Sequence, residues 1–227
     1  MSTIADALER VHARIREAAL AAGRNPAEIQ LLAVTKTKPA AMVREAYRAG
    51  QRAFGENYLQ DALPKMAELA GLDIEWHYIG RIQSNKTREI GAHFAWVHGL
   101  DKLKHAQRLN EQRPAELPEL NCCIQVNLSG EASKGGVAPQ ELPQLATQMA
   151  QLPRLRLRGL MTMPDPHSPP EAQRAVFERL AQLRHQLNAG GLALDTLSMG
   201  MSGDLELAIA AGSTMVRVGT DIFGARN

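Results

Sequence analysis

The segment 155–200 contains LRLRGLMTM (residues 155–163) and TLSMG (residues 196–200), two apolar runs of strand length. Between them, apolar residues recur at helical spacing and a glycine pair closes the pattern: Ala172, Val176, Leu180, Leu183, Leu187, Gly190 and Gly191. Apolar strands that alternate with helices are typical of a parallel sheet covered on both faces. This segment therefore predicts an α/β protein.

The same alternation extends along the rest of the chain. Six further apolar runs of strand length occur at residues 30–36, 52–56, 74–80, 94–100, 121–128 and 214–219. Helical patterns lie between successive runs, and an amphipathic helix that ends near Gly23 precedes the first one. The sequence thus predicts eight strands and seven intervening helices.

Eight strands in this order can close into a single (β/α)8 TIM barrel domain over residues 1–227. This barrel usually takes about 250 residues and needs at least roughly 200, so a chain of 227 residues has room for little else. An open doubly wound sheet is the alternative. It would require a glycine-rich turn after the first strand, where TKTKPA (residues 35–40) stands instead. We therefore expect the barrel.

Composition argues against several classes of protein. The net charge is +2, from 26 Lys and Arg against 24 Asp and Glu, so no charge excess indicates a nucleic acid or a membrane as partner. The N-terminal residues lack the apolar core of a secretion signal, and no apolar run reaches the roughly 18 residues of a membrane span. We therefore expect a cytoplasmic protein that is neither exported nor membrane-spanning.

The cysteines and the short motifs give further expectations. Cys122 and Cys123 are adjacent and cannot join distant segments, which fits a reducing compartment, and neighbours on a strand point to opposite faces. No CxxC, HExxH or G-x-S-x-G motif occurs, so we predict neither a metal site nor a serine triad. We expect a monomer.

Lys36 ends the first predicted strand, after the apolar residues 31–34. The carboxyl ends of the strands form the working face of a barrel, so this position puts an ammonium group at the mouth of an apolar core. Burial favours the neutral amine, which is the form that condenses with a carbonyl to give a Schiff base. A lysine whose stem packs while its head reaches water is the alternative. Lys38 is a weaker candidate, because Pro39 directly after it marks the exit from the strand.

A phosphate site is predicted where the seventh and eighth strands end. SMGMSGDLELAIAAG (residues 198–212) places Ser202 between glycines and before a helical pattern, for which Ser202 is the expected N-cap. The eighth strand brings Arg217, Gly219 and Thr220 to the same corner. Barrels often hold phosphate at the loops after these two strands, where backbone N–H groups and helix N-termini attract anions. An ordinary capped helix is the alternative.

A carbonyl-reactive lysine and a phosphate site at one mouth suggest a phosphorylated aldehyde. Pyridoxal 5'-phosphate and a sugar phosphate are the two candidates. Arg217 favours the first, because the ring nitrogen of pyridoxal 5'-phosphate needs a partner and arginine is one known partner. Arginine keeps its proton, so it would donate to an unprotonated ring nitrogen and weaken the ring as an electron sink.

A longer match supports this ligand. WHYIGRIQSNKTREI (residues 76–90) resembles a signature of the pyridoxal phosphate homeostasis proteins, and further matching segments follow in chain order at residues 31–39, 54–61, 159–163 and 197–226. The resemblance implies a barrel of the alanine-racemase type without that enzyme's second domain. It also implies a role in the homeostasis of pyridoxal 5'-phosphate, without established catalysis.

The resemblance further implies a role for each site residue. Lys36 would hold pyridoxal 5'-phosphate as a Schiff base, Arg217 would face its ring nitrogen, and Asn57 would lie near its phenolic oxygen. The phosphate would be held by Ser202, Gly219 and Thr220.

Four more residues are candidates with weaker signals. Ile79 could pack against the pyridine ring, and Met199, which adjoins the phosphate loop, could line the pocket. His77 shares a strand face with Ile79, but we prefer the interpretation of a histidine satisfied within the core. Lys134 lies in a glycine-rich loop after the fifth strand, where it could meet anions, and its role stays open.

Two functions compete. The first is a carrier that holds pyridoxal 5'-phosphate, keeps its free level low and releases it to apo-enzymes. The second is an enzyme, either a racemase-like amino acid enzyme or a lysine-dependent aldolase. The barrel-type racemase takes one of its acid–base groups from an extra domain, for which residues 220–227 leave no room. No acid–base partner for an aldolase can be placed either, so the sequence favours the carrier.

Overall fold

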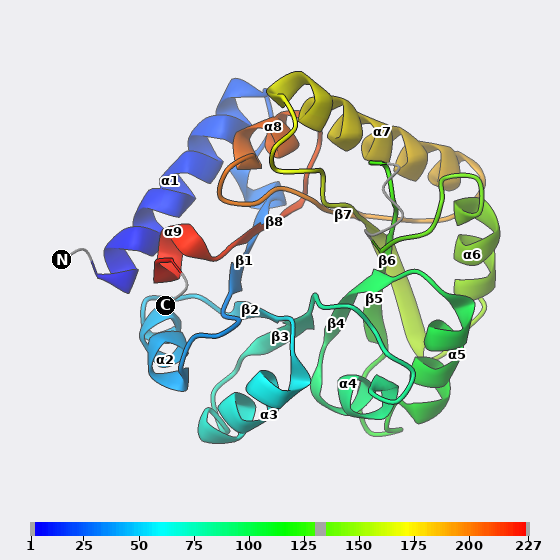
Figure 1. Cartoon of the computed structure of the whole chain (residues 1–227), viewed down its shortest axis with the longest axis horizontal. Helices are drawn as coiled ribbons and strands as arrows, with labels where there is room; N and C mark the ends of the chain where they lie inside the picture. The colour runs from blue at the N-terminus through cyan, green and yellow to red at the C-terminus, as the bar shows by residue number, and fades with distance from the viewer. Residues whose placement is uncertain (1–2, 130–134, 226–227) are drawn as a thin grey trace.

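Eight parallel strands close into a barrel in the order of the sequence, and helices surround it (Figure 1). The structure, a computed structural model, describes residues 3–129 and 135–225. The strands are β1 (Gln30–Val34), β2 (Ala53–Glu56), β3 (Glu75–Tyr78), β4 (Trp96–Leu100), β5 (Leu120–Gln125), β6 (Leu155–Met161), β7 (Thr196–Ser198) and β8 (Met215–Val218). Each strand coincides with one predicted run, so the predicted barrel is confirmed.

In the described part of the chain, seven α-helices connect the strands, as predicted, and one α-helix precedes the first strand. In the described residues the helices are α1 (Ile4–Ala21), α2 (Ala40–Arg48), α3 (Leu59–Glu68), α4 (Thr87–His93), α5 (Leu103–Gln112), α6 (Leu142–Met149), α7 (Pro170–Ala189), α8 (Leu205–Ala210) and α9 (Thr220–Phe223). The sequence pattern missed α9 and the short 3-10 helix η1 (Pro26–Glu28). Within residues 3–129 and 135–225, no helix combines the length and the apolar character of a membrane span.

Strand side chains alternate between the barrel interior and the layer beneath the helices. On β1, Leu31 and Ala33 pack in the outer layer while Leu32 belongs to the interior cluster. Cys122 and Cys123 follow the same rule, because Cys122 lies in the outer layer and Cys123 in the interior. The two thiols are fully buried and face opposite sides of β5, as the sequence predicts.

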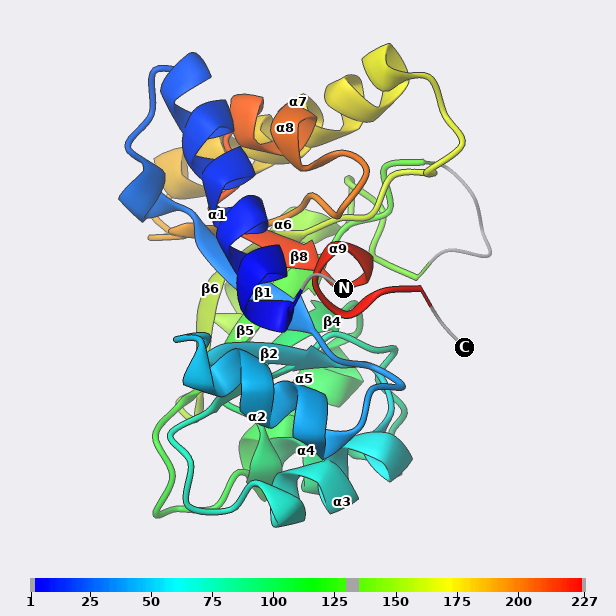
Figure 2. The same cartoon turned by 90° about the vertical axis from the view of Figure 1, so that its left-hand side faces the viewer.

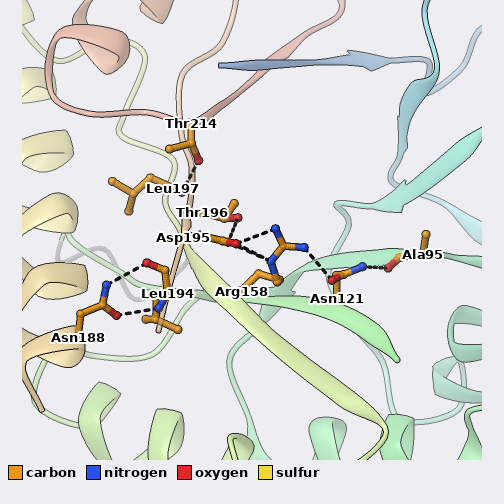
Figure 3. Close-up of polar contacts among 9 residues, drawn as sticks. All are labelled: Ala95, Asn121, Arg158, Asn188, Leu194, Asp195, Thr196, Leu197 and Thr214. Carbon is orange, nitrogen blue, oxygen red and sulfur yellow. Dashed lines mark hydrogen bonds and ion pairs between the residues drawn. The ribbon is translucent and has the colours of Figure 1, made fainter. Parts of the chain in front are cut away.

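The floor of the barrel, where the strands begin, carries polar side chains that form hydrogen bonds with neighbouring strands (Figure 3). Arg158 of β6 makes a forked contact with Asp195, with nitrogen–oxygen distances of 2.8 to 3.0 Å, and also donates to Asn121 Oδ1 at 3.1 Å. The hydroxyl of Thr214 accepts a hydrogen bond from the backbone N–H of Leu197 at 2.8 Å. These contacts link the starts of strands β5, β7 and β8 with β6.

Strands β1 and β8 pair with each other and close the barrel, in the register Leu32 opposite Arg217. At Gly219, just beyond β8, a Cβ atom would lie 3.1 Å from the carbonyl oxygen of Val34, so a side chain there would push the two strands apart. Helix α9 follows directly and lies against α1 in both views (Figures 1 and 2). The first and last strands therefore present their carboxyl ends side by side.

Candidate functional site

A cavity of about 260 Å³ opens at the carboxyl ends of the strands, which is the mouth of the barrel. It brings together seven of the eight residues that the sequence proposes for cofactor binding: Lys36, Asn57, Ile79, Ser202, Arg217, Gly219 and Thr220. Lys38, which the sequence ranks below Lys36, also lines the cavity, and its Nζ donates to the carbonyl oxygen of Ala225 at 2.8 Å. The cavity thus brings together residues at the ends of strands β1, β2, β3, β6, β7 and β8.

Lys36 is half-buried and sits between two residues that are held in place. Before it, Thr35 is fully buried, and its carbonyl oxygen accepts a hydrogen bond from Lys65 Nζ at 2.9 Å. After it, Thr37 has a φ of +64°, which a β-branched residue rarely adopts, and its N–H donates to Asp61 at 2.9 Å. The backbone on both sides of Lys36 is therefore fixed by side chains of α3.

A buried ion pair contacts Thr35, the residue before Lys36. Lys65 Nζ is 2.6 Å from Glu56 Oε1, and both side chains are almost completely buried. The hydroxyl of Thr35 donates to the same carboxylate oxygen, and Asp61 lies 3.2 Å from Lys65. Burial raises the pKa of Glu56, while the charge of Lys65 opposes this effect. Since a buried ion needs its partner, this pair ties α3 to the end of β2.

The sequence did not single out Lys65 or Glu56, although one signal was available. The run RAFGE (residues 52–56) ends a strand with a carboxylate directly after apolar residues. In a strand whose residues all prove to be buried, that carboxylate requires a cation. Lys65 lies on α3, whose sequence pattern is that of an ordinary amphipathic helix. The sequence alone therefore does not show that Lys65 is the partner of Glu56.

The predicted phosphate corner comprises Ser202, Gly219 and Thr220 at the ends of β7 and β8. In the described part of the chain, no backbone hydrogen bond uses the N–H groups of Ser202, Gly203 or Thr220 as donor. These N–H groups and the two hydroxyls form a group of donors at one side of the cavity. Such an arrangement can bind an anion with several oxygen atoms.

Ser202 is not the N-cap of the following helix, contrary to the prediction. The N-cap of α8 is Asp204, and the Asp204 carboxylate accepts a hydrogen bond from Met201 N–H at 2.6 Å. This bond closes a turn from Met201 to Asp204 before the helix begins, because Asp204 N–H also donates to the carbonyl oxygen of Met201. Ser202 therefore lies in the turn and lines the cavity.

Arg14 of α1 supports this corner from outside the cavity. It donates to the carbonyl oxygen of Ser202 at 3.0 Å, to Glu206 at 2.8 Å and to Asp221 at 2.5 Å. Glu206 and Asp221 stand in the first turns of α8 and α9, where their charges would repel an anion at the corner. Their ion pairs with Arg14 reduce that repulsion. No sequence motif marked Arg14, since its three partners come from the last 30 residues of the chain.

Arg217 lines the cavity from β8 and is almost completely buried. Its Nη1 donates to Ser198 Oγ at 2.8 Å, and its Nη2 donates to the carbonyl oxygen of Thr162 at 3.1 Å. Among the described residues, no carboxylate forms an ion pair with it. Burial lowers the pKa of Arg217 to about 10, against the opposing effect of the Asp204 carboxylate. The guanidinium therefore keeps its positive charge at neutral pH.

Asn57 and Ile79 line the same cavity from the ends of β2 and β3. The Asn57 Oδ1 atom is buried, and no hydrogen-bond partner for it exists among the described residues. A buried polar atom without a partner is unfavourable, so this position is suited to a bound polar group. Ile79 contributes apolar surface to the cavity, and so does Val34.

Met199 does not line the cavity, which corrects the sequence prediction. Along β7 and its continuation, side chains alternate, and Ser198 faces the interior, where it contacts Arg217. Met199 therefore faces outward, is fully buried and packs in the layer beneath the helices. Two other methionines, Met163 and Met201, line the cavity instead.

The remaining candidates have different outcomes. His77 is fully buried and hydrogen-bonded, so the interpretation of a satisfied core histidine is confirmed. Lys134 lies outside the described residues. Within the described ranges, no group of three or more His, Cys, Asp or Glu residues could hold a metal ion.

Comparisons with known proteins agree with this geometry. Residues 7–227 match the family model described as alanine racemase, N-terminal domain. The pyridoxal phosphate homeostasis protein of Pseudomonas aeruginosa is 65% identical to this chain, and the match covers 100% of this chain and 97% of that protein. The protein of the same name from Escherichia coli K12 is 53% identical, with 100% of this chain and 98% of that protein covered.

Solved structures show the same similarity. PipY of Synechococcus elongatus with PLP bound has a TM-score of 0.87 at 37% identity, and the match covers 98% of this chain and 100% of that one. Alanine racemase of Corynebacterium glutamicum has a TM-score of 0.68 at 19% identity, over 96% of this chain and 61% of that one, which shows a shared fold.

The closed barrel with its cavity at the carboxyl ends of the strands is a barrel of the alanine racemase N-terminal-domain class. The resemblance seen in residues 76–90 is confirmed by the full-length matches. The chain belongs to the family of pyridoxal phosphate homeostasis proteins.

Proposed function

We propose that this chain, as a single domain over residues 1–227, binds pyridoxal 5'-phosphate in the cavity at the barrel mouth and acts in its homeostasis and carriage. The single observation that carries this proposal is the meeting of Lys36, Arg217 and the phosphate corner on one cavity of about 260 Å³. Two of its relatives support the ligand: the homeostasis protein of Pseudomonas aeruginosa through its name, and PipY through its structure with PLP bound.

The residues present fit this group. The phosphate would accept hydrogen bonds from the hydroxyls and the unused N–H groups of Ser202 and Thr220. Gly219, which follows β8 and lies close to β1, would form the wall of the phosphate site between them. Ile79 would provide apolar contact for the pyridine ring, and the Asn57 amide would gain a polar partner that it lacks within the described residues. When bound, the group supplies an aldehyde that a neutral lysine amine can hold as a Schiff base.

Lys36 and Arg217 would then each have a defined task. Lys36 would provide the amine, since the backbone on both sides of it is fixed by Lys65 and Asp61. Arg217 would donate to the ring nitrogen and, because the guanidinium keeps its proton, would leave that nitrogen unprotonated. An unprotonated ring draws electrons weakly, so these residues favour holding the group over using it for catalysis.

The composition of the cavity further supports a carrier without catalysis. Among the described residues that line it, the only ionisable side chains are Lys36, Lys38 and Arg217. Racemisation needs proton donors and acceptors on opposite faces of a substrate, and the described lining offers no Asp, Glu, His, Tyr or Cys for that task. The likeness to alanine racemase therefore supports only the shared barrel, and a racemase-like activity is the alternative to be tested.

A visible-absorbance spectrum tests the binding. The purified protein should show the absorbance of a lysine Schiff base, and borohydride should abolish it and leave a pyridoxyl group on Lys36, found by peptide mapping. A protein that shows no such absorbance after incubation with pyridoxal 5'-phosphate would contradict the proposal.

A turnover assay separates the carrier from the enzyme. The loaded protein is incubated with each proteinogenic amino acid, followed by chiral chromatography and by assays for carbon dioxide, ammonia and keto acid. We expect no multiple turnover. Steady turnover that is lost in Lys36→Ala would establish an enzyme instead. Transfer of the cofactor to an apo-enzyme, compared with free cofactor at the same concentration, is the matching positive test.

We also propose that the carrier works in the cytoplasm as a monomer. The absence of a charge excess in the sequence supports a function that requires neither a nucleic acid nor a membrane as partner. Gel filtration with light scattering of the loaded protein measures the oligomeric state, and a dimer would refute this part of the proposal.

A further inference from the structure

A row of hydrogen-bonded side chains runs through the barrel interior from the cavity to the floor. Arg217 Nη1 is 2.8 Å from Ser198 Oγ, Ser198 Oγ is 2.7 Å from His98 Nδ1, and His98 Nε2 is 2.9 Å from His77 Nδ1. His77 Nε2 is 2.8 Å from Glu75 Oε1. The middle three side chains are fully buried, whereas the Glu75 side chain is 42% exposed at the start of β3.

When both histidines are neutral, the two ends of this row determine the direction of every bond in it. A guanidinium can only donate, so the Ser198 hydroxyl accepts from Arg217 and its own hydrogen is available to His98 Nδ1. The hydrogen of His98 is then on Nε2 and points to His77 Nδ1, and the hydrogen of His77 is on Nε2 and points to the Glu75 carboxylate. All four bonds are satisfied when both histidines are neutral.

The opposite direction is less favourable. It would require a charged His77 that donates from both ring nitrogens, and His98 would then donate from Nδ1 to Ser198. Burial lowers the pKa of His77, although Glu75 opposes this effect. Burial lowers the pKa of His98 well below its ordinary value, and the positive charge of Arg217 acts in the same direction. Neutral histidines thus agree with the one-directional row.

The row determines how Arg217 faces the cavity. A guanidinium has five N–H donors. In the described structure, one donor of Nη1 is used by Ser198 and one of Nη2 by the carbonyl oxygen of Thr162, on the interior side. Without the Ser198 hydroxyl, a buried donor would lose its acceptor, which is costly, and the guanidinium would turn to find another one.

We propose that Ser198 and His98 are positioning residues: through the one-directional row that ends at Glu75, they hold the Arg217 guanidinium where it can donate to a ring nitrogen in the cavity. The identity of the ring as that of pyridoxal 5'-phosphate rests on the proposed function. The direction of the row does not, because it follows from the protein's own side chains.

The first test measures the two histidines in the cofactor-free protein at pH 7. Long-range proton–nitrogen NMR of the imidazole rings should show His77 and His98 as neutral rings with the hydrogen on Nε2. A charged His77, or a hydrogen on Nδ1 of either ring, would overturn the proposal. This result does not depend on whether the cofactor binds.

The second test compares pyridoxal 5'-phosphate with its analogue in which a C–H group replaces the ring nitrogen. Wild-type protein should prefer the parent compound, and Ser198→Ala should reduce that preference about tenfold, the effect of losing roughly one well-placed charged hydrogen bond. Ser198→Thr keeps a hydroxyl and should restore the preference for pyridoxal 5'-phosphate. Melting temperatures confirm that each variant is folded.

The outcomes are distinct. Equal affinity of the folded wild type for the two compounds, or an equal loss of both affinities in Ser198→Ala, would overturn the positioning role. If the wild type bound neither compound, the proposed function would fail, and the NMR measurement would still decide the direction of the row.

Discussion

The mouth and the floor of the barrel differ in whether their polar side chains have hydrogen-bond partners within the protein. At the floor, Arg158 is matched by Asp195 and Asn121, and these contacts, drawn in Figure 3, join β6 to β5 and to the start of β7. At the mouth, the Asn57 Oδ1 atom has no partner among the described residues, and Ser202 lines the cavity. These polar groups of the floor bind one another within the protein, whereas a polar atom at the mouth is left for a ligand.

This difference indicates that the floor contributes mainly to stability and the mouth mainly to ligand binding. In barrels of this kind the loops at the carboxyl ends carry the site and the opposite end contributes stability. Changes at the floor should therefore alter unfolding and leave binding intact, while changes at the cavity should alter binding and leave unfolding nearly intact. The buried pair Lys65–Glu56 is the exception, because it lies at the mouth and serves both.

The largest effect on binding is expected for Lys36→Ala. This variant should lose the borohydride-trapped pyridoxyl group completely, because no other lysine sits at the end of β1 between two fixed residues. Its melting temperature should stay close to that of the wild type, since Lys36 is only half-buried. Lys38→Ala is the matched control and should still be labelled. A pyridoxyl group found only on Lys38 in the wild type would show that the assignment is wrong.

Lys65→Met should produce the largest loss of stability. It leaves the buried Glu56 without its cation, which typically costs about 3 to 5 kcal/mol of the free energy of unfolding. Because burial raises the pKa of Glu56, protonation relieves the uncompensated charge, so the loss should shrink as the pH falls. Urea unfolding at several pH values measures both effects.

The control for this prediction changes both partners of the pair. Lys65→Met combined with Glu56→Gln removes the charge as well as its partner, and it should be more stable than Lys65→Met alone at neutral pH. A double variant as unstable as the single one would mean that packing, and not charge, explains the loss.

An intermediate effect is expected at the phosphate corner. Wild-type protein should bind pyridoxal 5'-phosphate far more tightly than pyridoxal, and Ser202→Ala or Thr220→Ala should narrow that difference by about tenfold or more. Each lost hydrogen bond to a charged group is worth about 1.5 to 3 kcal/mol. Calorimetric titration with both ligands measures the ratio of the two affinities. Equal affinities of the wild type for the two ligands would contradict the proposed phosphate site.

The smallest effect is expected at the floor, for Asp195→Ala. The carboxylate is 53% exposed, so its loss should cost about 1 kcal/mol or less of stability and leave the affinity for pyridoxal 5'-phosphate unchanged. Burial raises the pKa of Asp195, but hydrogen bonds from Arg158 and Thr196 outweigh it and hold the pKa below its ordinary value. The contribution is therefore present above that ordinary value and is lost as the pH falls through the lowered pKa.

Thermal unfolding of wild type and variant at neutral and acidic pH checks the prediction at the floor. The two curves should approach each other in acid. An altered cofactor affinity in Asp195→Ala would contradict the separation of floor and mouth.

Much of the barrel and part of its mouth could be predicted from the sequence, because both depend on periodicity. Alternating strands and helices imply parallel pairing, and polar residues at strand ends must then meet at one edge. Lys36 and Arg217 lie 181 residues apart in the sequence, yet their positions at the ends of the first and last apolar runs bring them to one cavity.

The side-chain contacts that support the site could not be predicted, because the partners are distant in the sequence and meet only in the folded chain. Met199 was placed at the cavity by its sequence neighbourhood, whereas the alternation of β7 turns it outward. Arg14 and Lys65 read as ordinary polar positions of amphipathic helices until the fold brings carboxylates to them. His98 likewise gains its partner Ser198 only across the barrel interior.

The pairing of β1 with β8 has a consequence for biosynthesis. Lys36 leaves the ribosome early, but the strand that carries Arg217 is made last, about 180 residues later. At about 5 to 20 residues per second, that delay is roughly 10 to 40 seconds. A nascent or truncated chain would therefore expose the lysine without the phosphate corner, and only a chain translated through β8 could retain the ligand.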